Sequence, residues 1–284
     1  MKEKIRIIYE AITMEIREHK LSAFIYFTLR TLVIITMILQ LFNKNYENVF
    51  LCLLTLILLI VPSFIQVQFK IELPTTLEII ILLFIFCAEI LGEIQEFYVI
   101  FPMWDTILHT LNGFLAAAIG FSLVDLLNSN EHIQFKLSPL FVALVAFCFS
   151  MTIGVVWEMF EFTMDSFFGL DMQKDTIVTA IHSVTLDPTG GNTPTSITGI
   201  TETIVNGQVL NIDGYLDIGI IDTMNDLIVN FIGAAIFSAL GYVYIKNRGK
   251  KSFIDRFIPR QKDSDKDYLT IIKNKFNETY KNRE

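Results

Sequence analysis

The chain has 284 residues, of which 52% are hydrophobic and only 18% are charged, and its mean hydropathy is +0.51. Soluble domains carry about 25% charged residues, so this composition is typical of an integral membrane protein and excludes intrinsic disorder, collagen and secreted disulfide scaffolds. All three cysteines lie inside apolar runs, which predicts packing roles and not a disulfide framework or a thiol metal site.

A charged stretch, residues 1–21, opens the chain. Within it Ile5, Ile8, Ile12 and Ile16 recur at approximately helical spacing between the charges. This pattern predicts an amphipathic helix that lies on the membrane surface.

Six apolar segments follow, each of about the 20 residues that an α-helix needs to cross a bilayer. They predict an all-α, polytopic integral membrane protein with about six transmembrane helices, which form a membrane domain over residues 22–245. Small residues at four-residue spacing, such as Gly113 with Ala117, predict close packing of the fourth and sixth helices. The six segments are residues 22–42, 48–67, 74–93, 105–127, 138–162 and 221–245.

Basic residues are concentrated on one side of these segments. Nineteen of the 22 Lys and Arg residues fall in the two ends of the chain or in the second and fourth connections. The positive-inside rule therefore predicts that both termini are cytoplasmic.

The basic tail, residues 246–284, is expected to face anionic lipid at the cytoplasmic surface, with the lipid bilayer itself as the main partner. Phe253, Ile254, Phe257 and Ile258 could lie in the inner leaflet. The alternative for the last 25 residues is a solvated charged tail. No nucleic-acid motif accompanies the charge, so nucleic acid is not expected as a partner.

The loop over residues 167–220 is polar and acidic, and the orientation places it outside. Within it, Asn206–Gly207 between two short apolar runs predicts a β-hairpin. Asp187 to Gly191 reads as a cluster of turns. The loop is expected to form either a small β-structured cap over helix ends or a mobile acidic loop.

Polar side chains recur near the predicted outer ends of four of the helices. Ionisable groups inside a span are costly, so they need a structural or functional reason. These residues are Glu89 and Glu93 on the third helix, Asp105 and His109 on the fourth, Glu158, Glu161 and Asp165 on the fifth, and Asp222, Asn225, Asp226 and Asn230 on the sixth.

Helix capping could explain Asp105 and Asp222, which stand at helix starts. It cannot explain Glu158, Glu161 and Asp165, which stand near a helix C-terminus, where the macrodipole disfavours anions. The compensation is a bound divalent cation, a network of protonated carboxyl groups, or plain polar contacts between helices. One His among several carboxylates suits Mg, Mn, Ca or Zn.

The predicted site therefore has two groups of residues. The candidate metal ligands are His109, Glu158, Glu161, Asp222 and Asp226, and the other pocket residues are Asp105, Glu89, Glu93, Asp165, Asn225 and Asn230. Farther along the spans, Arg30 is expected either to pair with Glu78 or to snorkel to inner-leaflet phosphates.

Three motifs together resemble the YjdF-type bacterial inner-membrane proteins, a family catalogued as a domain of unknown function. They are Phe101 to Asp105 with His109 and Gly113, Trp157 to Glu161 with Asp165, and Asp222 to Asp226 with Asn230 and Gly233. The resemblance covers about residues 75–245 and implies a multi-pass protein of the bacterial plasma (inner) membrane. It implies no activity, and the loop over residues 180–217 departs from compact members.

Three functions remain open from the sequence. The pocket could bind or transport a divalent cation or a small polar solute. It could instead belong to a membrane enzyme that acts on a lipid headgroup or an envelope intermediate. In the third interpretation the polar stripes hold helices in register in a structural assembly partner. No HExxH, CxxC or nucleophile-elbow motif selects a reaction.

Overall fold

The computed structural model describes residues 2–128, 137–247 and 253–281. It is mostly helical, and its strands form small two-stranded antiparallel sheets. Five helices in the described part of the chain are long and apolar enough to cross a membrane, which confirms the predicted class. They are Lys20–Phe42, Tyr46–Phe69, Trp104–Asp125, Pro139–Phe168 and Ile220–Lys246.

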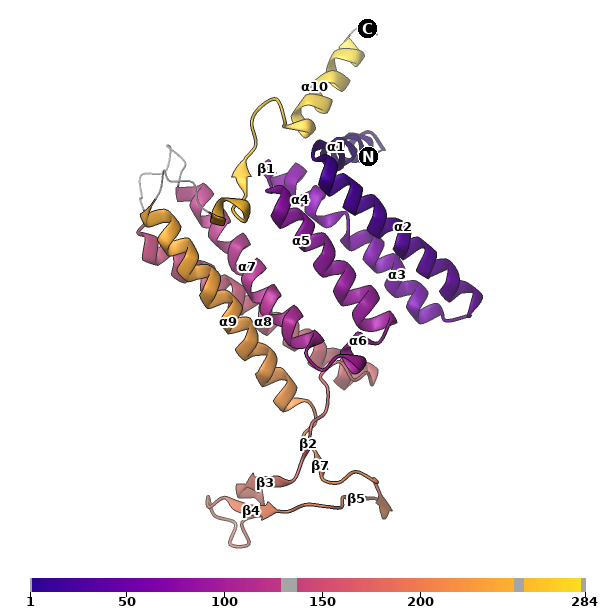
Figure 1. The fold of residues 1–284 in the computed structure, drawn as a ribbon, viewed down its shortest axis with the longest axis vertical. Coiled ribbons are helices and arrows are strands. Elements are labelled where there is room, and N and C mark those ends of the chain that lie inside the picture. Colours follow the sequence, from indigo (N-terminus) through magenta and orange to yellow (C-terminus); the bar gives the residue numbers. More distant parts are fainter. Residues whose placement is uncertain (1, 129–136, 248–252, 282–284) are drawn as a thin grey trace. The chain divides into compact units, whose positions relative to one another are not determined.

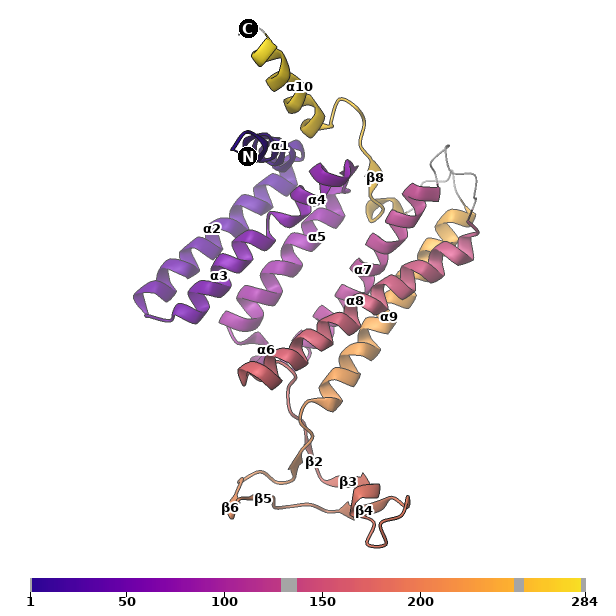
Figure 2. The same cartoon turned by 180° about the vertical axis from the view of Figure 1, so that it is seen from behind.

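Contacts divide the chain into two compact units, Met1–Met151 with Asn230–Glu284 and Thr152–Val229. The first unit begins with four helices. α2 packs along α3 and α5, as both ribbon views show (Figures 1 and 2). The predicted N-terminal helix is present as α1, and Pro62 stands at the start of α4, where it breaks the second span. The four helices are α1 (Lys2–Glu18), α2 (Lys20–Phe42), α3 (Tyr46–Leu58) and α4 (Val61–Phe69).

The third predicted span, residues 74–93, changes its helical winding partway. It begins as α5, Thr75–Phe86, and continues as the π-helix η1, Cys87–Ile94. The two pieces together are about as long as a membrane span, but neither piece alone reaches that length. Short α6, Phe97–Ile100, follows.

The expected ion pair between Arg30 and Glu78 is wrong. Arg30 donates to the hydroxyl of Tyr26 at 2.9 Å, one turn away on the same helix. Glu78 accepts from the Gln66 amide at 3.2 Å, and the same amide accepts from the Leu73 backbone at 2.8 Å. Arg30 and Glu78 therefore each form a hydrogen bond with a neutral side chain and not with each other.

Three long helices complete the membrane part: α7 (Trp104–Asn128), α8 (Pro139–Phe168) and α9 (Ile220–Lys246). In the first unit α7 and α9 touch through their backbones. A Cβ added to Gly113 would lie 2.1 Å from the Asn230 carbonyl oxygen, and one added to Gly233 would lie 2.0 Å from that of Thr110. The predicted close packing of these two helices is confirmed.

An aromatic and aliphatic core fills the first unit around α7. Phe114 and Phe121 of α7 contact Phe237 of α9, with ring centroids 5.0 and 6.0 Å apart. Phe257, from the segment after α9, packs on Phe114 at 5.3 Å. Ile254 and Phe257 are each only 6% exposed in this core, whereas Phe253 is 63% exposed; the place of this segment in the inner leaflet stays a prediction.

The C-terminal tail is ordered against the N-terminal elements of the same unit, which corrects the alternative of a solvated tail. Strand β8 pairs with β1, and α10 packs on α1, because apolar faces of the two helices meet around Ala11 and Ile272 (Figure 1). The elements are β1 (Ile71–Glu72), the 3-10 helix η3 (Phe253–Arg256), β8 (Arg260–Gln261) and α10 (Tyr268–Lys281).

The second unit contains the loop between α8 and α9, with three small sheets (Figure 2). The predicted hairpin is confirmed: Asn206 and Gly207 both have positive φ, 52° and 78°, in the tight turn. The turn cluster is also present, since the Asp187 carboxylate accepts from the backbone of Thr189 and Thr193. The sheets pair β2 (Ile177–Val178) with β7 (Tyr215–Leu216), β3 (Ala180–Ser183) with β4 (Thr195–Thr198), and β5 (Ile204–Val205) with β6 (Gln208–Val209); the 3-10 helix η2 (Val184–Leu186) follows β3.

Candidate functional site

The first turns of α7 hold an aspartate and a histidine on one face. Asp105 and His109 are four residues apart, a spacing that stacks side chains on the same side of a helix. The His109 Nε2 lies 3.4 Å from the Asp105 Oδ1. His109 is buried and Asp105 is partly exposed. An imidazole and a carboxylate are thus paired near the start of a membrane helix.

One turn farther along α7, a buried amide pair joins α7 to α9. The Asn112 Nδ2 donates to the Asn230 Oδ1 at 3.2 Å, and Asn230 is only 1% exposed. The Asn230 Nδ2 in turn approaches the Ser150 carbonyl at 3.5 Å, and the Ser150 hydroxyl donates to the Gly113 carbonyl at 2.7 Å. These bonds fix three helices against one another directly after the level of His109.

Beyond this amide pair the core of the first unit is apolar and tightly packed. Ala117, Phe121, Ala234 and Phe237 are each 0% exposed. A Cβ on Gly241 would come within 2.7 Å of the Phe121 ring. The polar groups at the start of α7 therefore stand at one end of a packed helix pair.

In the second unit, the end of α8 carries the predicted carboxylates. Glu158 and Glu161 are 5% and 7% exposed, and the Trp157 indole N–H donates to the Glu161 Oε1 at 2.7 Å. Asp165 accepts from the backbone N–H groups of Met172 and Gln173 at 2.7 and 2.8 Å. Both carboxylate oxygens of Asp165 thus hold the chain that leaves α8, which is a structural role.

Asp217 binds the backbone at the start of α9, a role that sequence reasoning missed. Asp217 accepts from the Ile221 backbone N–H at 2.9 Å and from Thr176 at 2.7 Å. Burial opposes its ionisation, but these N–H donors hold the pKa of Asp217 below its ordinary value. An aspartate three residues before an apolar helix is a recognisable signal for such a cap.

The predicted residues of α9 differ in their surroundings. Asp222, which was a candidate cap, accepts from the Lys174 backbone N–H at 2.8 Å. Asp226 is only 3% exposed, whereas Asn225 is exposed. Asp226 therefore has the burial expected of an inward-facing ligand, and Asn225 does not.

On the π-helix η1 of the first unit, Glu89 is partly buried and Glu93 is exposed. π-helical turns occur frequently at functional sites. The change of winding at Cys87–Ile94 was not predicted, although Glu89, Gly92 and Glu93 interrupt the apolar run there.

No curated protein and no solved structure matches the chain. A family model described as a predicted membrane protein matches residues 25–247, which include the polar residues described above and leave out all of α1 and all of α10. The match spans most of the chain, and its description agrees with the helices found in the structure. The chain therefore belongs to the DUF2238 family of predicted membrane proteins.

Proposed function

We propose that this protein binds a divalent cation at the N-terminal ends of α7 and α9, with Asp105, His109 and Asp226 as the central ligands. The observation that carries the proposal is the grouping of these side chains. Each offers one ligand atom, and these three atoms lie within 4.8 Å of one another.

Helix geometry supports the same grouping. α9 is one continuous helix over Ile220–Lys246, and its Asn230 bonds to Asn112 of α7. Asp226 lies one turn before Asn230, and His109 lies about one turn before Asn112, so each stands on the face that its helix turns toward the other.

The ligand chemistry fits a divalent ion. Two carboxylates and one imidazole provide the oxygen and nitrogen donors that Mg, Mn and Zn accept. Two anionic groups would balance the charge of such an ion, which removes much of the cost of carboxylates inside a membrane. Glu158, Glu161 and Asp222 are proposed as further groups around the ion, with Glu89, Glu93, Asp165, Asn225 and Asn230 outside its direct ligands.

The site is proposed to open to the outside of a bacterial plasma membrane, with both termini cytoplasmic and α1 beside anionic lipid. This orientation rests on the distribution of Lys and Arg. The narrower resemblance to YjdF-type proteins rests on the three motifs alone.

A second candidate function is an enzyme that acts on a lipid headgroup or envelope intermediate at the same ion. It is favoured by the backbone contact between α7 and α9 at Gly113 and Gly233 and by the apolar packing beyond it. A transporter would have to part these helices, whereas an enzyme needs access from one side only. A bound ion would polarise a phosphoryl or carbonyl oxygen.

The test is metal analysis of the purified full chain after exposure to Mn²⁺ or Zn²⁺ and removal of free ion. The wild type should retain about one ion per chain, and Asp226→Asn and His109→Ala should lose it. Asp213→Asn, an exposed change in the loop, is the matched control.

Thermal unfolding should show that all variants are folded. Retention of the ion by both ligand variants, or its absence from a folded wild type at saturating metal, would overturn the proposal.

A further inference from the structure

The end of the helix bundle where α1 and α10 lie is closed by the chain's own C-terminal segment, and we call this end the terminal end. Beyond α9 the first unit also contains η3, Phe253–Arg256. Ile254, Phe257 and Ile258 are 4–6% exposed and belong to the same core as Leu77 of α5 and Phe114 of α7. A short segment outside the membrane helices thus supplies part of the membrane core.

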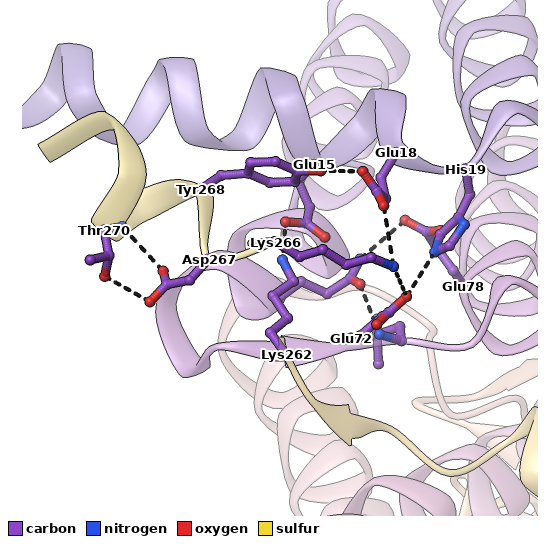
Figure 3. A network of polar contacts seen from close by, with 12 residues as sticks. Glu15, Glu18, His19, Glu72, Glu78, Lys262, Lys266, Asp267, Tyr268 and Thr270 are labelled. Carbon is purple, nitrogen blue, oxygen red and sulfur yellow. Dashed lines mark hydrogen bonds and ion pairs between the residues drawn. The ribbon is translucent and has the colours of Figure 1, made fainter. Parts of the chain in front are cut away.

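Polar contacts then hold the tail to the N-terminal elements (Figure 3). The Lys262 ammonium pairs with the Glu15 carboxylate, and both side chains are only 3% exposed. Lys266 lies between two carboxylates, 2.9 Å from Glu72 and 3.3 Å from Glu18. These two lysines connect the tail to α1 and to the β1 strand.

Around the lysines lies a second set of contacts. The Tyr268 hydroxyl donates to Glu18 (Figure 3). The Lys70 ammonium lies 2.6 Å from the Asp267 carboxylate. The guanidinium of Arg6 on α1 stacks over the Phe276 ring of α10, 5.2 Å from its centroid.

Attachment of the tail depends strongly on the buried ion pair between Lys262 and Glu15. A buried ion pair is kept by its geometry, and removal of one member leaves an uncompensated charge that strongly destabilises the structure. Burial raises the pKa of Glu15, against the effect of Lys262. The buried Glu15 carboxylate therefore depends on its pairing with Lys262 of the tail. Loss of this pair would release the tail as a unit.

We infer that the C-terminal segment is a plug held by a latch: Ile254, Phe257 and Ile258 close the terminal end of the bundle, and Lys262 and Lys266 fasten them to α1 and β1. Release of the latch would expose the core beside α5 and α7. The inference rests on contacts inside the first unit and does not depend on the proposed metal site.

Hydrogen exchange of the full-length protein tests the latch. Lys262→Met should speed amide exchange across residues 260–281 by roughly a hundredfold, because it leaves Glu15 buried without its partner. Lys273→Met, an exposed lysine of α10, should leave exchange unchanged. The double variant Glu15→Gln with Lys262→Met should recover most of the protection, since neither buried charge remains.

Labelling of a reporter cysteine tests the plug. With the native cysteines replaced, Leu77→Cys places a thiol under Ile254 and Phe257, at a fully buried position. A water-soluble maleimide should label it slowly in the otherwise unchanged chain and at least about tenfold faster with Lys262→Met or Phe257→Ala.

The inference is overturned if Lys262→Met exchanges and labels like Lys273→Met, or if the reporter reacts equally fast with the latch intact. Metal content, measured in the same preparations, separates the two proposals. Latch variants should keep the ion, and Asp226→Asn should keep the latch.

Discussion

Two glycines determine how closely α7 and α9 approach each other. Gly113 and Gly233 each face a backbone carbonyl of the opposite helix, where any side chain would collide. The amide pair of Asn112 and Asn230 lies beside these contacts. Close backbone approach and one interhelical amide bond therefore act together to set the level at which His109 is held.

We predict that Gly233→Ala destabilises the protein. Its Cβ would meet the Thr110 carbonyl oxygen at 2.0 Å, and relief of this overlap must push the helices apart, at a cost of at least about 2 kcal/mol. Thermal unfolding in detergent should show a clearly lower midpoint. Ile236→Ala, on the exposed side of α9, is the control and should shift the midpoint far less. A wild-type midpoint for Gly233→Ala would mean that the helices do not touch there.

Spacing in the sequence predicted which residues share a helix face, because helical periodicity fixes this without any knowledge of the fold. Asp105 with His109 and Asn230 with the small residues of α9 follow from it directly. Partners on other elements do not follow. The pairing of Arg30 with Glu78 was one of two alternatives and rested on depth alone, whereas Tyr26 and Gln66 bind these two residues.

Among the structural elements, the packing of the C-terminal tail was the hardest to predict from the sequence. α10 has apolar residues at helical spacing, but the same pattern could serve a lipid surface or another helix. Its burial is decided by the apolar face of α1, more than 250 residues earlier in the chain. The hairpin was predictable for the opposite reason: its turn chemistry is entirely local.

We predict that docking of α10 weakens at acid pH, in part through Asp267. Burial opposes the ionisation of Asp267, but Lys70 and Thr270 hold its pKa below the ordinary value of 3.8. A carboxyl group with a lowered pKa stabilises the docked state above its ordinary pKa, and this contribution is lost as the pH falls through the lowered value. Exchange protection of α10 should therefore fall below about pH 4.

The variant Asp267→Asn removes the charge that pairs with Lys70 but keeps an oxygen that can cap α10. Asn can still cap α10 at Thr270, so the variant should lose only about 0.5 kcal/mol at neutral pH, because Lys70 is half exposed. Its loss of protection below pH 4 should be shallower than in the wild type. Some acid dependence should remain, since the hydrogen bond from Tyr268 lowers the pKa of Glu18. An identical acid profile in the variant would contradict a role for Asp267.

For the molecule as a whole, the packing of α1 on α10 limits the number of membrane crossings. The first and last helices of the described chain are in contact, which predicts that both lie on the same side of the membrane. A chain that starts and ends on one side must cross an even number of times. Five helices in the described part of the chain qualify as spans by length and composition, so an even number predicts a sixth crossing segment. The continuous run of α5 and η1 is the segment with suitable length and hydropathy.

We therefore predict that α5 and η1 cross the bilayer, with the termini inside. In a chain without native cysteines, Gln95→Cys and Asn192→Cys should react with a membrane-impermeant maleimide in intact cells, because the positive-inside rule places the loops that carry them outside. Lys70→Cys and Asn274→Cys should react only after the membrane is opened. If Lys70 and Gln95 report the same side, the segment between them does not cross, and contact between α1 and α10 would require another segment to cross in its place.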